Sequence, residues 1–207
     1  VVIAMREVGG AIWDGKTQME PEKDENGVYL IQNGYELSWF ASNHNNANAK
    51  LVEDFSLGGF GVSISSYTGT FDGNGHYITD FFGSKSLFQS PRNGAVIKNL
   101  GVSGIVEQNG NQWTVAQGGI VANGFSTAAD FTVENCVSRV NVTGTGACGG
   151  IASFAESQSS MTMPKIKNCY NTGTVTSTNG IGYPGGIGGI YEGNPIQHVE
   201  NCYDIGD

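Results

Sequence analysis

Carboxylate side chains are the groups in this sequence best suited to polysaccharide chemistry. Hydrolysis of a glycoside generally uses two carboxyl groups about 5 to 10 Å apart, and lyase chemistry uses a base together with a cation. Acids are sparse in the second half of the chain: Glu107, Asp130, Glu134, Glu156, Glu192, Glu200, Asp204 and Asp207. Apart from one charged position, no two of them occupy corresponding places in the repeat described below. We therefore predict that the chain has no catalytic site and is not an enzyme.

Cysteine and histidine side chains could bind a metal ion, but their spacing is unsuitable. The cysteines recur at wide intervals, at Cys136, Cys148, Cys169 and Cys202. No Cys-x-x-Cys pair is present, and no familiar zinc-site spacing is completed by His44, His76 and His198. The segment Asp72-Gly73-Asn74-Gly75 lacks the later carboxylates of a calcium loop, and its alternate glycines suit a tight turn. We predict no metal and no cofactor.

The dominant signal is an internal repeat, which decides the expected fold. Four segments share the order β-branched, charged, Asn, apolar, and their Asn residues are 36, 33 and 33 positions apart: residues 97–100, 133–136, 166–169 and 199–202. A Gly-Gly-Ile element follows in residues 118–120, 149–151 and 185–187, with an echo at 188–190. Two constant strands separated by variable loops are typical of a solenoid. We predict an all-β fold, a right-handed parallel β-helix.

Stacking of the coils would place equivalent residues in columns about 4.8 Å apart. The predicted inward aliphatic column is Ile97, Val133, Ile166 and Val199, and beside it lies a column of Leu100, Cys136, Cys169 and Cys202. Adjacent cysteines are close enough for a disulfide, but side chains in register point the same way, which is a poor geometry for that bond. Buried free thiols are therefore favoured, and the state of Cys148 stays open.

Two polar columns are expected at the corner of each coil. Asparagine tolerates left-handed backbone geometry and can hydrogen-bond to the next coil, which predicts a ladder of Asn99, Asn135, Asn168 and Asn201. The charged position alternates in sign through Lys98, Glu134, Lys167 and Glu200. This alternation avoids like charges on neighbouring strands and supports the register.

These residues also resemble a known family. Gly149-Gly150-Ile151 and residues 166–175 resemble the GLUG repeat of large bacterial surface proteins, and residues 69–78 resemble the GTFDGNGHTI element upstream of such repeats. Ser86-Leu87-Phe88 falls where that family has Gly-Leu-Phe-Gly, and the resemblance covers about residues 13–207. Leu100 in place of Cys and Gln89 in place of Gly depart from the pattern. The resemblance implies secretion and a cell-surface role, usually in bacteria, without implying an activity.

The first third of the chain is expected to cover the N-terminal end of the solenoid. Asn33 can cap a short helix over residues 34–43, and residues 19–26 suit a solvated loop. The first strand is expected at 51–57, followed by 68–71 and 77–82 with a tight turn between them. We therefore divide the chain into a lead-in and cap (1–50), first coils (51–96) and GLUG-like repeats (97–207), which stop partway through a repeat.

Charge and composition limit the classes of molecule that this chain is expected to bind. The net charge of −9 without a basic cluster disfavours nucleic acid and anionic lipid, and no stretch is long and apolar enough to insert into a membrane. Further repeats or another chain are expected to cover the C-terminal end. Glycans or surface proteins of a host or microbe remain as partners. Aromatic side chains in the variable loops could stack on sugars or simply pack locally: Trp113, Phe125, Phe154, Tyr183 and Tyr191.

The expected function is accordingly a non-catalytic, extracellular scaffold or adhesin segment of a bacterial cell-surface protein. The alternative is a carbohydrate-binding or polysaccharide-active β-helix module. An exposed row of aromatics flanked by paired carboxylates would favour the alternative, whereas a smooth face of Asn, Ser and Thr would favour the scaffold.

Overall fold

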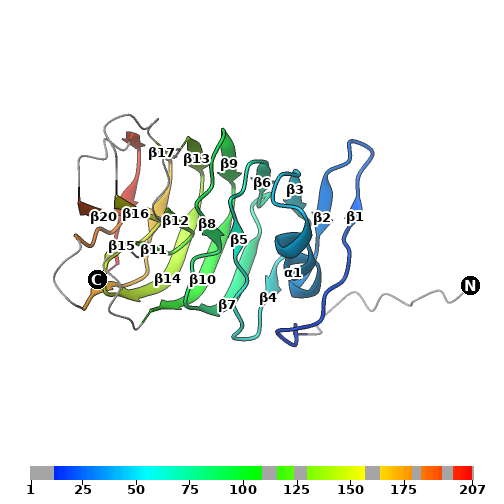
Figure 1. Ribbon diagram of the computed structural model, residues 1–207, viewed down its shortest axis with the longest axis horizontal. Coiled ribbons are helices and arrows are strands. Elements are labelled where there is room, and N and C mark those ends of the chain that lie inside the picture. Colours follow the sequence, from blue (N-terminus) through cyan, green and yellow to red (C-terminus); the bar gives the residue numbers. More distant parts are fainter. Residues whose placement is uncertain are drawn as a thin grey trace, which may run out of the picture.

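The computed structural model is an elongated stack of parallel β-sheets (Figure 1). It describes residues 12–108, 116–123, 130–156, 164–178, 183–192 and 198–206. The chain passes repeatedly through three main sheets, A, B and C, and we call each such passage a coil. Successive coils lie side by side along the long axis of the molecule, from β1 and β2 at one end to β20, β21 and β22 at the other.

Sheet A contains the segments with the charged position and ends at the asparagine corner. In spatial order its strands are β1 (Glu22–Lys23), β2 (Tyr29–Ile31), β3 (Ala49–Leu51), β6 (Thr70–Asp72), β9 (Ala95–Lys98), β13 (Phe131–Glu134), β17 (Lys165–Lys167) and β21 (His198–Glu200). The β1–β2 pair is antiparallel, and the other pairs of this sheet are parallel.

Sheet B follows the corner. Its strands are β4 (Phe55–Ser56), β7 (Tyr77–Gly83), β10 (Gly101–Glu107), β14 (Val137–Gly144), β18 (Tyr170–Asn171) and β22 (Tyr203–Asp204), with β19 (Val175–Ser177) also pairing with β14. All of these pairs are parallel. In β14, buried and more exposed side chains alternate along most of the strand, as expected where one face covers the core.

Sheet C closes each coil before the chain returns to sheet A. Its strands are β5 (Ile64–Ser65), β8 (Phe88–Gln89), β12 (Val121–Asn123), β16 (Ala152–Glu156) and β20 (Gly188–Glu192). A small parallel pair, β11 (Ala116–Gly118) with β15 (Ala147–Gly149), precedes the Gly-Gly-Ile corner. The predicted all-β architecture with parallel sheets is therefore present in the described residues.

The repeat stacks in the predicted register. Ile97, Val133, Ile166 and Val199 are paired in succession across sheet A. The first three are fully buried, whereas Val199 is 46% exposed because it lies in the last described coil. In the next column Leu100, Cys136 and Cys169 are buried and Cys202 is partly exposed.

The asparagine corners have the predicted backbone geometry. Their φ angles are +52° at Asn99, +54° at Asn135, +51° at Asn168 and +52° at Asn201. This left-handed region is strained for most side chains but accessible to asparagine. The recurrence of Asn every thirty-odd residues thus reflects a turn that each coil must make between sheets A and B.

The Gly-Gly-Ile element forms the corner before sheet C. A Cβ atom on Gly119, Gly150 or Gly186 would overlap Ser138, Asn171 or Asp204 respectively. Gly118, Gly149 and Gly185 lie in register, as the repeat predicted. The echo Gly188-Gly189-Ile190 instead pairs with residues 152–154 of β16, so it belongs to the following strand.

The helix α1 (Gly34–Asn43) occupies the predicted residues. Asn33 Oδ1 accepts a hydrogen bond from the N–H of Glu36 at 3.0 Å, and Glu36 Oε2 accepts one from the N–H of Gln32 at 2.8 Å. The first bond satisfies a backbone donor of the first helical turn, and the second ties Glu36 to the residue before the cap. Leu37 and Phe40 are fully buried in the core, so the helix fills the interior beside the first coils.

The N-terminal strands differ from the prediction. Parallel pairing already begins with β2, before α1, so residues 51–57 are not the first strand. Residues 19–26 are also not entirely a loop, because β1 lies within them. Residues 51–57 contain the last residue of β3 and the whole of β4, and these two strands lie in different sheets. Strands β6 and β7, on either side of the Asp72-Gly73-Asn74-Gly75 turn, also lie in different sheets, so this turn is a corner of the stack.

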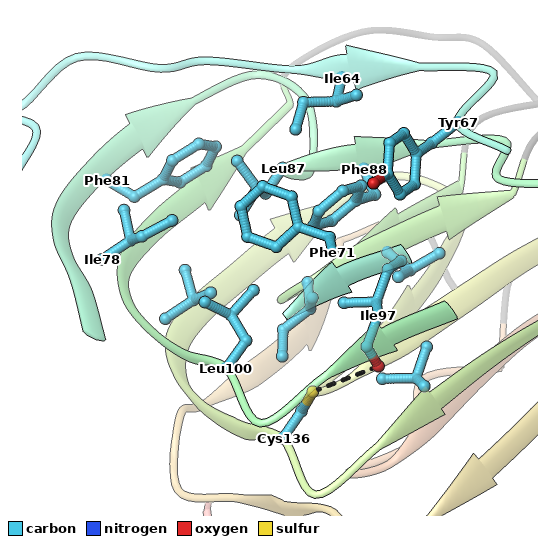
Figure 2. Close-up of a cluster of buried hydrophobic side chains, with 14 of the residues drawn as sticks. Ile64, Tyr67, Phe71, Ile78, Phe81, Leu87, Phe88, Ile97, Leu100 and Cys136 are labelled. Carbon is cyan, nitrogen blue, oxygen red and sulfur yellow. Dashed lines mark hydrogen bonds between the residues drawn. The ribbon is translucent and has the colours of Figure 1, made fainter. Parts of the chain in front are cut away.

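The core is aromatic near the N-terminal end (Figure 2). Tyr67, Phe71 and Phe88 are fully buried, with ring centroids 5.2 to 6.4 Å apart. Tyr67 Oη donates a hydrogen bond to Ala47 O at 2.8 Å, and burial raises the pKa of this phenol. In the next coils Ile97 is in register with Phe71 and Val121 with Phe88, so aliphatic side chains replace these two rings.

Candidate functional site

The asparagine corners form a continuous hydrogen-bonded ladder. Each Nδ2 group donates to the Oδ1 atom of the preceding coil: Asn135 to Asn99 at 3.1 Å, Asn168 to Asn135 at 3.1 Å and Asn201 to Asn168 at 3.2 Å. Asn99 donates in turn to Asp72 Oδ1 at 3.0 Å. The carboxylate of Asp72 therefore accepts at one end of the ladder, and Asn201 lies at the other.

Asp72 is a member of the ladder that sequence analysis missed. Partial burial acts to raise the pKa of Asp72, but the hydrogen bonds from Asn99 and the Asn74 backbone, together with nearby Lys98, lower it overall. The carboxylate is therefore ionised at neutral pH. Its segment was not aligned with the repeats because four residues, 73–76, separate Asp72 from β7, whereas two separate Lys98 from β10.

The charged column is longer than the sequence repeat indicated. Strand register places Lys50 next to Asp72, and Asp72 next to Lys98, ahead of the four predicted positions. The sign alternates across all six positions: Lys50, Asp72, Lys98, Glu134, Lys167 and Glu200. Ion pairs join Lys98 to Asp72 at 3.5 Å and Lys167 to Glu200 at 3.8 Å. Exposed pairs contribute little energy, so their main effect is to favour this register.

The corner cysteines stack in single file as free thiols. The N–H of Cys136 donates to Cys169 Sγ, and the N–H of Cys169 donates to Cys202 Sγ, both at 3.4 Å. Cys136 Sγ also lies 3.7 Å from Ile97 O in the preceding coil (Figure 2). Cys148 is a free thiol as well, and burial raises its pKa to about 11. Burial likewise raises the pKa of Cys136.

This arrangement predicts selective alkylation of Cys202. With iodoacetamide at pH 8 and no denaturant, Cys202 should react about tenfold or more faster than the other three cysteines, because only its side chain is partly exposed. Peptide mapping by mass spectrometry after timed quenching measures each rate. In denaturant all four should react alike. Equal native rates at Cys169 and Cys202 would contradict the stacked column.

The predicted aromatic residues do not form one cluster within the described residues. Phe154 lies in β16, not in a loop; it is 3% exposed and stacks on Phe131, so a surface ligand cannot reach it. Tyr183 is 71% exposed. Tyr191 belongs to strand β20, also not a loop, and its side chain is outside the described residues, as are Trp113 and Phe125 in full.

Sheet B presents aromatic side chains that sequence analysis missed. Tyr170 and Tyr203 are paired in neighbouring coils, and their rings are parallel to within 4° with centroids 5.3 Å apart. Tyr203 is 58% exposed. Further along the stack, Phe82 and Ile105 are in register and are 50% and 41% exposed. The signal that could have located the tyrosines is their common position two residues after Asn168 and Asn201.

An acid and a histidine also meet on the surface. His76 Nδ1 lies 2.8 Å from Asp54 Oδ1, which also accepts the N–H of Tyr77 at 3.0 Å. The Tyr77 hydrogen bond and then the His76 contact lower the pKa of Asp54. These contacts brace the start of β7 against the segment before β4. General base catalysis would additionally require a substrate within reach of the imidazole.

One carboxylate pair departs from the sequence expectation. Glu156 of β16 and Glu192 of β20 are partners in the strand register, so two acids outside the charged column do occupy corresponding positions. The signal that could have located them is their common position five residues after Ile151 and Ile187 of the Gly-Gly-Ile element. Like charges on adjacent strands are unfavourable by themselves, in contrast to the alternating column.

Comparison of the chain with family models, curated proteins and solved structures found no match. Among the described residues, no group of three or more His, Cys, Asp or Glu side chains could hold a metal ion. The helix in the described part of the chain is too short and too polar to span a membrane. The geometry of the columns is therefore the basis for a functional proposal.

Proposed function

We propose that the chain is a non-catalytic, extracellular scaffold or adhesin segment of a bacterial surface protein, built as a right-handed parallel β-solenoid. The observation that carries this proposal is the continuity of the columns: aliphatic, thiol, amide and charged groups each contact their equivalents in the next coil. Crossovers between parallel strands of one sheet are right-handed in nearly all proteins, which supports the handedness.

A scaffold needs rigidity along its axis, and the interactions between coils supply it. Backbone pairs in three sheets, the asparagine ladder and one shared core all act between neighbouring coils. Most polar groups of the corners are occupied by this stacking, so they are used for structure. The resemblance of residues 149–151 and 166–175 to GLUG repeats supports the extracellular and bacterial assignment. Burial of Cys136, Cys148 and Cys169 protects these three thiols from oxidation in such surroundings.

The scaffold proposal predicts no sugar binding and no cleavage. On a glycan array, the chain should bind no defined sugar at micromolar concentration. Incubation with pectin, alginate and other anionic and neutral polysaccharides should release neither reducing ends nor unsaturated products. Micromolar binding of a defined sugar, or measurable release of products, would count against a purely structural role.

A second candidate, a carbohydrate-binding or polysaccharide-active module, has two observations in its favour. The stacked Tyr170 and Tyr203 rings offer an apolar face to a sugar, and Glu156 and Glu192 are adjacent in register. If the array detects a ligand, Tyr203→Ala should abolish its binding while Tyr183→Ala preserves it. If cleavage is detected, Glu156→Gln and Glu192→Gln should each remove it.

A further inference from the structure

Asparagine followed by glycine is a dipeptide that loses its side-chain amide without an enzyme. The backbone nitrogen of the glycine attacks Cγ of the asparagine. A bond from that nitrogen to Cγ forms, the bond from Cγ to Nδ2 breaks, and ammonia leaves with the proton of the glycine N–H. Water then opens the resulting succinimide to aspartate or isoaspartate. The attack requires an asparagine side chain and a glycine N–H that are free to move together.

Four Asn-Gly pairs lie wholly within the described residues. One of them begins α1, where Gly34 is buried against Trp13 and Asn33 Oδ1 accepts the N–H of Glu36. The start of the helix therefore holds this pair in place. The other three pairs are exposed: Asn26-Gly27, Asn74-Gly75 and Asn93-Gly94.

Contacts between coils restrain two of the exposed pairs. The N–H of Gly75 donates to Asn99 O, and the N–H of Gly94 donates to Asp130 O, both at 2.8 Å and both in the following coil. The Nδ2 group of Asn74, which would leave as ammonia, also donates to a carbonyl oxygen of the preceding coil at 3.3 Å. Attack by either glycine nitrogen therefore requires neighbouring coils to separate locally.

The third exposed pair lies at the tip of the β1–β2 hairpin, and its contacts are local. The N–H of Gly27 donates to Asp24 O at 3.0 Å, and Asp24 Oδ1 accepts the N–H groups of Asn26 and Val28 at 2.8 and 2.9 Å. All of these bonds lie within residues 24–28. Opening this turn breaks no pairing between coils, so it costs less free energy than separating coils does.

We propose that Asn26 is the principal site of spontaneous deamidation in the described part of the chain, and that the stacking of coils protects Asn74 and Asn93. The product at position 26 adds a negative charge beside Asp24 and Glu25. In the isoaspartate form it also adds a methylene group to the backbone of the hairpin tip. The modification therefore accumulates at the β1–β2 hairpin while the corners between coils stay intact. The proposal holds for either candidate function, because it rests on which glycine N–H groups are bonded between coils.

Peptide mapping by mass spectrometry measures the rate at each site. The full chain is kept at pH 8 without denaturant, sampled over several weeks and digested under acidic conditions, which suppress further deamidation. Asn26 should react about tenfold or more faster than Asn74 and Asn93, since a turn opens more often than coils separate. In denaturant the three sites should react at similar rates, because glycine follows each asparagine.

A change in the turn tests the local origin of the rate. Asp24→Ala removes the acceptor for the N–H groups of Asn26 and Val28, so it should raise the rate at Asn26 about threefold. The rates at the other two exposed pairs should not change, which also shows that the stack is intact. Glu25→Ala is the matched control, because it removes an exposed carboxylate from the same turn and keeps both bonds. It should leave the rate at Asn26 unchanged.

Two outcomes would overturn the proposal. One is a rate at Asn74 or Asn93 in the native chain that equals or exceeds the rate at Asn26. The other is an unmodified Asn26 in the native chain over a period in which the denatured chain is fully deamidated, since the turn would then protect its asparagine as well as the coils do.

Discussion

Alanine in place of Gly150 is expected to lower the free energy of unfolding by about 3 kcal/mol, as overpacking in a rigid interior does. The added Cβ atom would lie 2.5 Å from Asn171 Cγ and would overlap the backbone oxygen of Gly186 in the next coil. Asn171 is fully buried and Gly186 is backbone, so neither can move aside easily. Chemical denaturation followed by circular dichroism measures the change.

Gly83→Ala is the matched control for this substitution. A Cβ atom there would find its nearest neighbours at 3.3 Å, at the last residue of β7, so the unfolding free energy should change by less than about 1 kcal/mol. If Gly150→Ala were as stable as Gly83→Ala, the Gly-Gly corners would not be packed against sheet B as described.

Alanine in place of Asn135 should cost about 2 to 3 kcal/mol of unfolding free energy. The substitution removes the hydrogen bonds to Asn99 and from Asn168, and it places alanine at a φ of +54°. Each ladder hydrogen bond is worth about 1 kcal/mol and the left-handed conformation costs alanine about 1 kcal/mol. Denaturation midpoints of the purified variants provide the measurement.

Two further variants separate these contributions. Asn135→Gly retains access to the left-handed region, so it should recover about 1 kcal/mol relative to Asn135→Ala. Asn201→Ala removes one described ladder bond at an exposed end and should cost less than Asn135→Ala. Equal losses for Asn135→Ala and Asn201→Ala would show that the ladder does not stabilise the stack.

The two stability predictions concern different corners of the coil. The asparagine corner joins sheets A and B by a backbone conformation that few residues adopt, whereas the Gly-Gly corner is required by close packing against polar side chains of sheet B. Gly119, Gly150 and Gly186 face Ser138, Asn171 and Asp204 respectively, so the sheet B residue that faces this corner is polar in each of these coils. Residues of both corners contact the neighbouring coil as well as their own coil.

Much of the fold was predictable from the sequence because stacked coils repeat their requirements. A residue in one coil contacts its equivalent in the next, so the need for an aliphatic side chain, an asparagine and a cysteine recurs at each turn of the stack. The spacing of Asn99, Asn135, Asn168 and Asn201 therefore predicted both their columns and the register. The helix at 34–43 was predictable for a local reason, since Asn33 caps its start.

Only the tertiary structure decided the features that do not repeat at a constant interval. Lys50 and Asp72 join the charged column although their corners differ in length from those of later coils, because core packing sets the register there. Phe154 is buried because it stacks on Phe131. The apolar composition of a segment does not by itself distinguish a buried aromatic side chain from an exposed one. Local sequence thus determined the corners, and contacts between coils determined which side chains meet.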